Sequence, residues 1–543
     1  MLEREGGRHL SDAKLSWRRY CGFFELSIKD FMTIQESLLR EELDLVAASP
    51  LGKRLFGGKI PTTEDFRNAL PLTTYKDYQS FLASKREDIL PEKPAFWAFT
   101  TTTAGAEKWT PFTARAVNRL IDYTIAALIL ATARHKGDIN IGPGERIMYN
   151  VAPAPFLSGL MAHGLAERCN LRGIPPSLHD SLGFQGALEE GFKHSLVHGC
   201  DVVISMTPVM LKIGQRFSAM SASHANGLRK TRDLRVLFRI AQARIKSIIE
   251  HRPILPKDLW NLKGVIGWGI DTSLLRDKIR YYWGREPYEF MACSEVGILA
   301  MQSWSKRAMT FVPAAAFLEF IPEEELAKEQ DAQGYNPRTV LLNELEPGKR
   351  YEVVATSFYG MPLLRYRLGM LVRVVAMEDP RDGIQLPQVE LVGRTGGLID
   401  LAGFTRLDEK TIWSALVQAG LEHGNWTARK EMAGEDPSLA LYIELEPNTD
   451  VAELQEKVHS ALKSLDPSYR DLESLLNIKA LRMVRLNPGT FRAYTNLISE
   501  NGLMRGLAYQ VPKVDASPEV VDKLLELSGS FVQQQKVESL PPR

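Results

Sequence analysis

Short apolar runs of strand length alternate with stretches of helical spacing between residues 95 and 400. Four of these runs are Arg146–Ala152, Asp201–Ser205, Gly264–Gly269 and Tyr351–Ser357. Strands that are separated by helices along a chain usually pack into layers of sheet and helix. The pattern therefore predicts a large mixed α/β domain in this part of the chain.

The pattern changes after Arg394, where fewer and shorter elements follow one another. The expected helices and strands are Lys410–Ala419, Ala440–Leu445, Val451–Ser464 and Ile478–Leu486, in the order helix, strand, helix, strand. This content is typical of a small α+β domain. We therefore predict an N-terminal domain at residues 1–395 and a C-terminal domain at residues 396–543, with a hinge at Gly396-Gly397.

The charge balance gives no sign of a nucleic-acid partner. Lys plus Arg number 67 and Asp plus Glu number 66, so the formal net charge is +1. Nucleic-acid-binding domains usually carry a basic patch and a high pI. The segment Arg229–Arg244 is locally basic, and we interpret it as a solvated helix face. We expect no nucleic-acid partner.

The cysteines and the apolar runs bear on the compartment. Four cysteines, at positions 21, 169, 200 and 293, are scattered without metal-ligand spacing, which fits a reducing cytoplasm. The polar N-terminus does not resemble a signal peptide. The longest apolar run, Ile125–Ala133, is far shorter than the ~20 residues of a membrane helix. It predicts a buried helix, and we expect no membrane partner.

A hydroxyl-rich stretch follows the apolar residues at positions 97–99. Its candidate phosphate-binding residues are Thr100, Thr101, Thr102, Thr103, Gly105 and Lys108. Backbone N–H groups and hydroxyls can donate to a polyphosphate, a glycine lets the chain bend close, and a lysine supplies charge. The spacing is not that of the GxxxxGK(S/T) P-loop, so that fold is not implied. Taken alone, the stretch fits a polar turn with a solvated lysine equally well.

The residues from Phe99 to Thr113 resemble the (S/T)SGT(T/S)xGxxKxxP loop of adenylate-forming enzymes. Together with Trp97 and the lead-in Leu70–Tyr78, they are similar to one subfamily in particular. This is the acyl-acid amido synthetase family of the Gretchen Hagen type, which conjugates auxin and jasmonate to amino acids. The resemblance implies a large N-terminal adenylate-forming domain and a small mobile lid domain. It also implies that the threonines and Gly105 bind the nucleotide and that Lys108 is catalytic.

Met291–Glu295 corresponds to the family's Tyr-x-x-Ser-Glu motif. The resemblance implies that Ser294 lies near the nucleotide and that Glu295 binds Mg2+, which takes hard oxygen ligands. By itself, a Ser-Glu pair would more often cap a helix. Its position about 190 residues after the loop is where the family has it.

Thr356–Gly369 is similar to the family's T-x-x-x-G-L-Y-R-Y-R-L-G-D motif. The resemblance implies that Tyr366 contacts the nucleotide and that Arg367 is catalytic. The alternative is an edge strand with two arginines on its outer positions.

Two later segments extend the match to about residue 515. Gly393-Arg394 resembles the hinge, where Arg394 would reach the ribose or a phosphate of the nucleotide. Pro488–Phe491 and Tyr509–Lys513 resemble the C-terminal ending of the family, which makes Lys513 a candidate catalytic lysine.

The resemblance implies a reaction in two steps. A carboxylate attacks the α-phosphate of ATP to give an acyl adenylate and pyrophosphate, and an amine then displaces AMP. Positioning and neutralisation of negative charge should dominate such a site, so cations and Mg2+ are expected in it. The partners would be a small-molecule carboxylic acid and an amine, and the small domain would rotate between the steps.

Four residues depart from the family pattern at functional positions. Thr101 replaces a glycine, Met291 a tyrosine, Met370 the ribose-binding aspartate and Gln510 the C-terminal lysine. Methionine cannot accept the ribose hydrogen bonds in any useful way. Two hypotheses stay open: an active acid–amine ligase with a relaxed nucleotide site, or a scaffold that no longer adenylates and binds a small molecule or catalyses an ATP-independent condensation or cyclisation. A CoA ligase fits fewer of the motifs.

Overall fold

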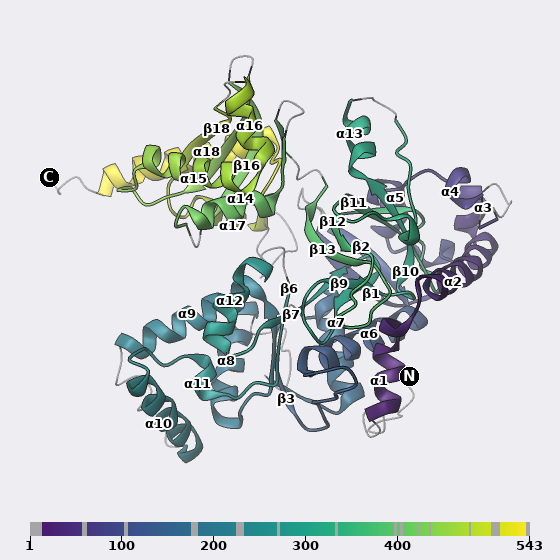
Figure 1. Cartoon of the computed structure of the whole chain (residues 1–543), viewed down its shortest axis with the longest axis horizontal. Coiled ribbons are helices and arrows are strands. Elements are labelled where there is room, and N and C mark those ends of the chain that lie inside the picture. The colour runs from purple at the N-terminus through teal and green to yellow at the C-terminus, as the bar shows by residue number, and fades with distance from the viewer. Residues whose placement is uncertain are drawn as a thin grey trace. The chain divides into compact units, whose positions relative to one another are not determined.

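The computed structural model describes residues 13–56, 62–63, 65–101, 107–151, 153–174, 183–223, 233–268, 272–331, 335–395, 399–401, 405–421, 424–433, 436–476, 479–500 and 511–538. The chain divides into two compact units (Figure 1). The large unit contains Met1–Thr100, Glu107–Leu368 and Val372–Leu391, and the small unit contains Thr101–Ala106, Gly369–Leu371 and Val392–Arg543. The predicted domain boundary at residues 395/396 and the mobility of the C-terminal domain stay predictions, and Gly396 and Gly397 lie outside the described residues.

A mixed sheet forms the centre of the large unit. In the described residues it has eleven strands in the order β10-β11-β12-β13-β9-β8-β7-β6-β5-β3-β4. The strands are β3 (Arg146–Asn150), β4 (Arg172–Ile174), β5 (Val202–Met206), β6 (Gly264–Trp268), β7 (Pro287–Cys293), β8 (Gly297–Gln302), β9 (Met309–Phe311), β10 (Ala316–Pro322), β11 (Arg350–Ser357), β12 (Tyr366–Ala376) and β13 (Gln388–Arg394). From β4 to β7 the neighbours are parallel, whereas β7–β8, β8–β9, β9–β13 and β10–β11 are antiparallel. The four predicted apolar runs are β3, β5, β6 and β11, so the mixed α/β class is confirmed.

Helices connect the strands of the large unit. They are α1 (Ala13–Cys21), α2 (Ile28–Ala48), α3 (Pro50–Phe56), α4 (Phe66–Ala69), α5 (Tyr75–Leu82), α6 (Ala114–Thr132), α7 (Leu157–Cys169), α8 (Gly183–His198), α9 (Thr207–Ser223), α10 (Leu234–Ile249), α11 (Pro256–Leu259), α12 (Thr272–Trp283) and α13 (Glu323–Asp331). Helix α6 is the buried helix that the apolar run predicts, because every side chain from Tyr123 to Thr132 is buried. Among the described residues, no helix combines the length and the apolar character that a bilayer span requires.

The predicted phosphate loop lies between two paired strands. β1 (Pro94–Thr101) and β2 (Glu107–Thr113) form a two-stranded sheet of their own, and residues 102–106 lie outside the described residues. β2 leads directly into α6, whose first turn is capped by Thr113, since the threonine Oγ1 accepts the N–H of Ala116 at 3.3 Å. This connection joins the end of β2 directly to the buried helix α6.

The small unit has the α+β content that its sequence pattern predicts. Its strands are β14 (Ile399–Leu401), β15 (Thr405–Leu407), β16 (Trp426–Ala433), β17 (Asp436–Glu444) and β18 (Leu481–Leu486). Its helices are α14 (Glu409–Gln418), α15 (Val451–Leu465), α16 (Pro467–Leu476), α17 (Thr490–Glu500) and α18 (Pro518–Glu538). β16 pairs antiparallel with β17, which pairs in parallel with β18. Apolar side chains of α14 and α15, such as Leu416 and Leu462, form one core with the sheet residues Leu441 and Ile443.

Helix α10 contains most of the described part of the segment Arg229–Arg244, for which a solvated helix face is expected. Its first part, Arg229 to Arg232, lies outside the described residues. In the helix, Val236 and Ala243 are buried, whereas large apolar residues such as Phe238 and Ile248 face solvent, with 65% and 71% of their surface exposed. The solvated face therefore carries large apolar side chains beside exposed basic residues such as Arg235 and Arg244.

Candidate active site

Lys108 lies near the start of β2 and is the centre of a buried polar cluster. Its Nζ donates to the carboxylate of Glu295 and to the hydroxyl oxygen of Tyr366, the latter at 2.7 Å. Only 9% of the surface of Lys108 and 9% of that of Glu295 is exposed. Buried charges need a partner because leaving them unpaired in the interior is costly. The fold thus joins residues that are 187 and 258 positions from Lys108 in the sequence.

Two aromatic rings complete the surroundings of the Lys108 ammonium. Its Nζ lies 5.0 Å from the ring centroid of Tyr366 and 5.2 Å from that of Tyr75, within the range of a cation–π interaction. Tyr75 begins helix α5, and its hydroxyl accepts the N–H of Trp109 at 3.0 Å. The sequence motif Leu70–Tyr78 contains Tyr75, although no role for this residue was predicted. The ammonium is therefore held by one carboxylate and two phenol rings.

Glu295 lies in the tight turn between β7 and β8. The strands are antiparallel and Cys293 pairs with Gly297, so Ser294 and Glu295 lie at the tip of a hairpin. Gly297 has φ +84°, and a Cβ there would lie 2.8 Å from Cδ1 of Leu120, so this position favours glycine. The alternative of a helix cap for the Ser-Glu pair is wrong, because the pair lies in the turn between two strands.

Tyr366 and Arg367 are neighbours on β12, and their side chains therefore point to opposite faces of the sheet. Tyr366 points to Lys108, whereas Arg367 binds Glu352 through Nη2 at 2.5 Å and Glu329 through Nη1 at 2.6 Å. Burial works to lower the pKa of Arg367, but its bonds to Glu352 and Glu329 outweigh burial and raise that pKa. The fold does not bring Arg367 into the Lys108 cluster.

Burial raises the pKa of the Tyr366 hydroxyl well above its usual range, and the nearby carboxylate of Glu295 adds to this effect. The phenol therefore stays protonated near neutral pH. Because Lys108 donates to the phenol oxygen, the phenol proton itself is available to an acceptor.

Arg365, the other arginine of the motif, is a buried structural residue. Its guanidinium pairs with Glu319 through Nη2 at 3.0 Å and Nε at 3.1 Å, and its Nη1 donates to the carbonyls of Arg67 and Leu70. Only 3% of Arg365 is exposed. Arg365 thereby holds the segment before α5 against the start of β12. This contact positions Tyr75 on α5 and Tyr366 on β12. The sequence contained both arginines but gave no basis for separating their roles.

The threonine-rich loop is described only at its first two positions. Thr100 is partly buried in β1, and Thr101 ends that strand with its side chain outside the described set. Thr102, Thr103 and Gly105 lie outside the described residues. Their predicted nucleotide contacts stay predictions.

The remaining candidates belong to the small unit. Arg394 is the last residue of β13, with its side chain outside the described set. Lys513 runs beside β16, where its carbonyl accepts the N–H of Ala428 at 2.8 Å and its Nζ lies 5.2 Å from the ring centroid of Trp426. Met370 is buried with 4% exposure, and Gln510 lies outside the described residues.

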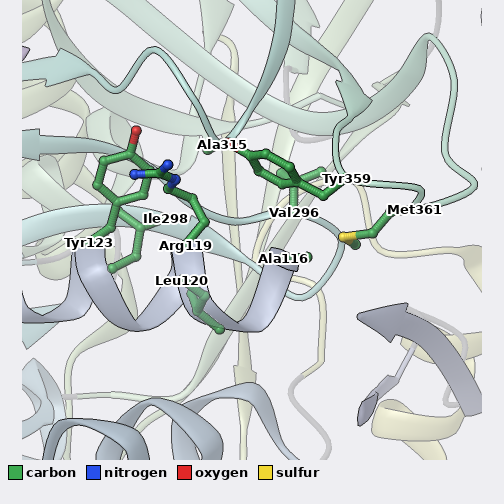
Figure 2. Close-up of a pocket in the computed structure, with 9 residues that line it drawn as sticks. All are labelled: Ala116, Arg119, Leu120, Tyr123, Val296, Ile298, Ala315, Tyr359 and Met361. Carbon is green, nitrogen blue, oxygen red and sulfur yellow. The ribbon is translucent and has the colours of Figure 1, made fainter. Parts of the chain in front are cut away.

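A hollow opens beside the strand that follows Glu295. Its lining residues come from α6, β8 and the connections around residues 315 and 360: Ala116, Arg119, Leu120, Tyr123, Val296, Ile298, Ala315, Tyr359 and Met361 (Figure 2). Figure 2 shows the Arg119 guanidinium beside the ring of Tyr123. Arg119 also forms a side-chain hydrogen bond with Tyr359. Both tyrosine hydroxyls are fixed by the backbone of Ala314, at 3.1 and 3.0 Å. The walls of the hollow are apolar apart from the Arg119 guanidinium and the two tyrosine hydroxyls, and in this structure its volume of about 10 Å³ has room for about one water.

The fold is that of an acyl acid amido synthetase. The GH3.15 acyl acid amido synthetase in complex with 2,4-DB is 17% identical, with a TM-score of 0.66 over 95% of this chain and 96% of that one. At this identity the similarity shows the fold alone.

Two family models match the sequence. The GH3 family N-terminal domain matches residues 21–153 and the GH3 family central domain matches residues 309–394. Both matched segments are similar to domains of the GH3 family, and the family predicted from the sequence is confirmed. Lys108 and Tyr366 lie within the two matched segments.

Curated relatives resemble the chain over different lengths. The human GH3 domain-containing protein is 28% identical over 195 residues, which cover 33% of this chain and 34% of that protein. The first three such relatives are matched over 24% to 51% of their own length. The jasmonoyl–L-amino acid synthetase JAR4 of Nicotiana attenuata is 22% identical over 530 residues, covering 86% of this chain and 88% of that protein.

Proposed function

We propose that the protein is an ATP-dependent ligase that joins a carboxylic acid to an amine through an acyl adenylate. The observation that carries this proposal is the buried cluster of Lys108, Glu295 and Tyr366. Each residue comes from a different motif of the family resemblance, and the three motifs are far apart in the sequence. The names of the GH3.15 and JAR4 proteins, an acyl acid amido synthetase and a jasmonoyl–amino acid synthetase, support the same reaction class.

In the first step, negative charge accumulates on the phosphates of ATP as the carboxylate attacks and pyrophosphate leaves. A preorganised cation in a buried site stabilises such charge more strongly than one in water. Lys108 is the candidate for this role, with Tyr366 as a hydroxyl donor beside it. Thr100, Thr101, Thr102, Thr103, Gly105 and Ser294 are the proposed backbone and hydroxyl contacts to the nucleotide, and Arg394 is the proposed contact to its ribose or phosphates.

Glu295 is the proposed ligand of Mg2+. In the described part of the chain, no group of three or more His, Cys, Asp or Glu side chains is arranged to hold a metal ion. A single carboxylate fits Mg2+ nevertheless, because this ion usually keeps several waters and takes other oxygens from nucleotide phosphates. The ion would neutralise phosphate charge. For Glu295 to serve, Lys108 has to give up its bond to this carboxylate and bind the phosphates instead.

We further propose that the hollow beside β8 widens to take the carboxylic acid, with Arg119 as the group that recognises its carboxylate. The amine would be an amino acid or another small amine. Arg367 and Lys513 are proposed to act in catalysis only indirectly or in a second conformation, because Arg367 is held by two carboxylates and Lys513 packs on Trp426. We expect the protein to work in the cytoplasm, which suits its four free cysteines.

A second candidate is the scaffold that has lost adenylation. The buried Met370 favours it, because the side chain at the position of the family's ribose-binding aspartate is apolar and 4% exposed. Such a protein would keep the Lys108 cluster for stability alone.

Hydroxamate trapping separates the two candidates. A ligase incubated with ATP, Mg2+, hydroxylamine and a panel of carboxylic acids should release a hydroxamate with at least one acid. Lys108→Ala should abolish the product, whereas Lys349→Ala, an exposed lysine of the same unit, should not. Calorimetry with ATP and AMP is the second test. A protein that binds neither nucleotide at millimolar concentration would contradict the proposed ATP-dependent ligase.

A further inference from the structure

Helix α10 presents an apolar stripe to solvent along its whole length. The stripe consists of large side chains that are 40% to 79% exposed: Leu234, Leu237, Phe238, Ile245, Ile248 and Ile249. At about 100° per residue, the six side chains fall within about 120° of the helix circumference. The helix has 16 residues, so the stripe is about 24 Å long. Contiguous apolar surface of this kind usually marks a binding face.

Basic residues border the stripe on both sides. The exposed Arg244 lies along one edge, and the exposed Arg235 and Lys246 lie along the other. The helix contains no acidic residue, although Arg235 pairs with the capping residue Asp233 at 2.9 Å. Among the described residues, no carboxylate forms an ion pair with Arg244 or Lys246.

The opposite side of the helix is anchored to the large unit. Val236 and Ala243 are buried there, and Arg239 donates to the carbonyls of Leu196 and Ser195 at 2.5 and 3.3 Å. Figure 1 shows α10 at the periphery of this unit, next to α11. A partner that wraps around the helix would have to detach it, whereas a flat partner reaches the stripe and both basic edges without any rearrangement.

We propose that α10 is a docking helix for an anionic lipid surface. A helix with a stripe of Leu, Ile and Phe and with basic edges lies in the plane of the membrane interface. The stripe would sink among the acyl chains while Arg244 and Lys246 reach the lipid phosphates. A second copy of the chain fits less well, because pairing two such faces would bring like charges together. This departs from the sequence-based expectation of no membrane partner.

Vesicle co-sedimentation with the full chain tests the proposal. The protein should bind mixed vesicles of phosphatidylcholine and phosphatidylserine about tenfold or more better than pure phosphatidylcholine vesicles, and added salt should weaken this binding. Phe238→Glu combined with Ile245→Glu should reduce the binding about tenfold or more, since it places charge in the stripe. The matched control is Val375→Glu, an exposed apolar residue on β12 that is 46% exposed.

Two further measurements keep the proposal open to refutation. Circular dichroism checks that the stripe variant folds. If it does not, Arg244→Glu with Lys246→Glu leaves the stripe intact and should still reduce binding to the anionic vesicles about tenfold. Equal binding to both vesicle types, or wild-type binding by either variant, would overturn the proposal. Sedimentation that shows a dimer, converted to a monomer by the stripe variant, would assign the face to a second copy instead.

Discussion

Variants of the ion pair between Lys108 and Glu295 can separate the contribution of this pair to protein stability from its contribution to catalysis. Glu295→Gln keeps the size of the side chain but removes its charge, and Lys108→Met removes the ammonium while keeping a long apolar stem. Both side chains are 11% exposed, so each single substitution leaves one partner uncompensated in a largely buried place. We expect each single variant to lose stability and the double variant to regain most of it.

The structure sets the expected magnitudes. Removing one partner of a buried ion pair costs about 3–5 kcal/mol, because the other charge stays desolvated without its counter-charge. Lys108 in Glu295→Gln keeps the Tyr366 hydroxyl at 2.7 Å and the two aromatic rings, which places the cost near the lower end, about 3 kcal/mol. Replacing both partners by neutral groups of similar size is often close to neutral, so the double variant should lie within about 1 kcal/mol of wild type.

Urea unfolding of the four proteins, followed by circular dichroism, gives the coupling free energy as a double-mutant cycle. We expect about 5 kcal/mol or more for this pair, because the two single losses add to at least about 6 kcal/mol and the double variant loses at most about 1 kcal/mol. The exposed pair Lys349–Glu346, at 2.9 Å, is the control and should give less than about 1 kcal/mol. A double variant as unstable as the worse single variant would refute the reasoning. The double variant should be stable but should not adenylate an acid. Adenylation by this variant would show that the Lys108 cluster is not needed for catalysis.

Three other variants test separate parts of the account. Burial raises the pKa of Glu42 from 4.5 to about 8, so the folded state keeps a proton that the unfolded chain loses. The free energy of unfolding should therefore fall as the pH rises from about 4.5 to about 8. Glu42→Gln should remove this pH dependence in urea titrations at several pH values. Gly297→Ala should lower the free energy of unfolding by about 1–2 kcal/mol, because φ at this position is +84° and the added Cβ would crowd Leu120. The substitution should also lower activity, because it would shift the turn that holds Glu295. Arg119→Leu should raise KM for the acid at least about tenfold with KM for ATP unchanged, and the reverse pattern would assign the hollow to the nucleotide.

Much of the architecture could be predicted from the sequence, because the relevant signals are local. The apolar runs that became β3, β5, β6 and β11 are short and bounded, and α6 contains an uninterrupted apolar run. Four elements of the small unit, α14, β17, α15 and β18, followed equally from periodicity, whereas the others were not predicted. Lys108, Glu295 and Tyr366 could be proposed because each lies in a motif with its own spacing.

The remaining features depend on tertiary contacts that a linear pattern does not contain. Arg365 and Arg367 look alike in the motif, but Arg365 is buried against Glu319 and Arg367 faces Glu352 and Glu329. Tyr75 approaches Lys108 only because the lead-in segment packs on β12. The apolar solvent face of α10 could not be recognised, since the same periodicity would describe a helix with its apolar face buried.

Exchange of radiolabelled pyrophosphate into ATP tests the central claim most directly, because it measures acyl-adenylate formation without the amine. We predict exchange that requires Mg2+ and one or more members of a panel of carboxylic acids. It should be lost in Lys108→Met and in Glu295→Gln and retained in Lys349→Met. Exchange that persists in Lys108→Met, or the absence of both exchange and ATP binding in the wild-type protein, would contradict the account.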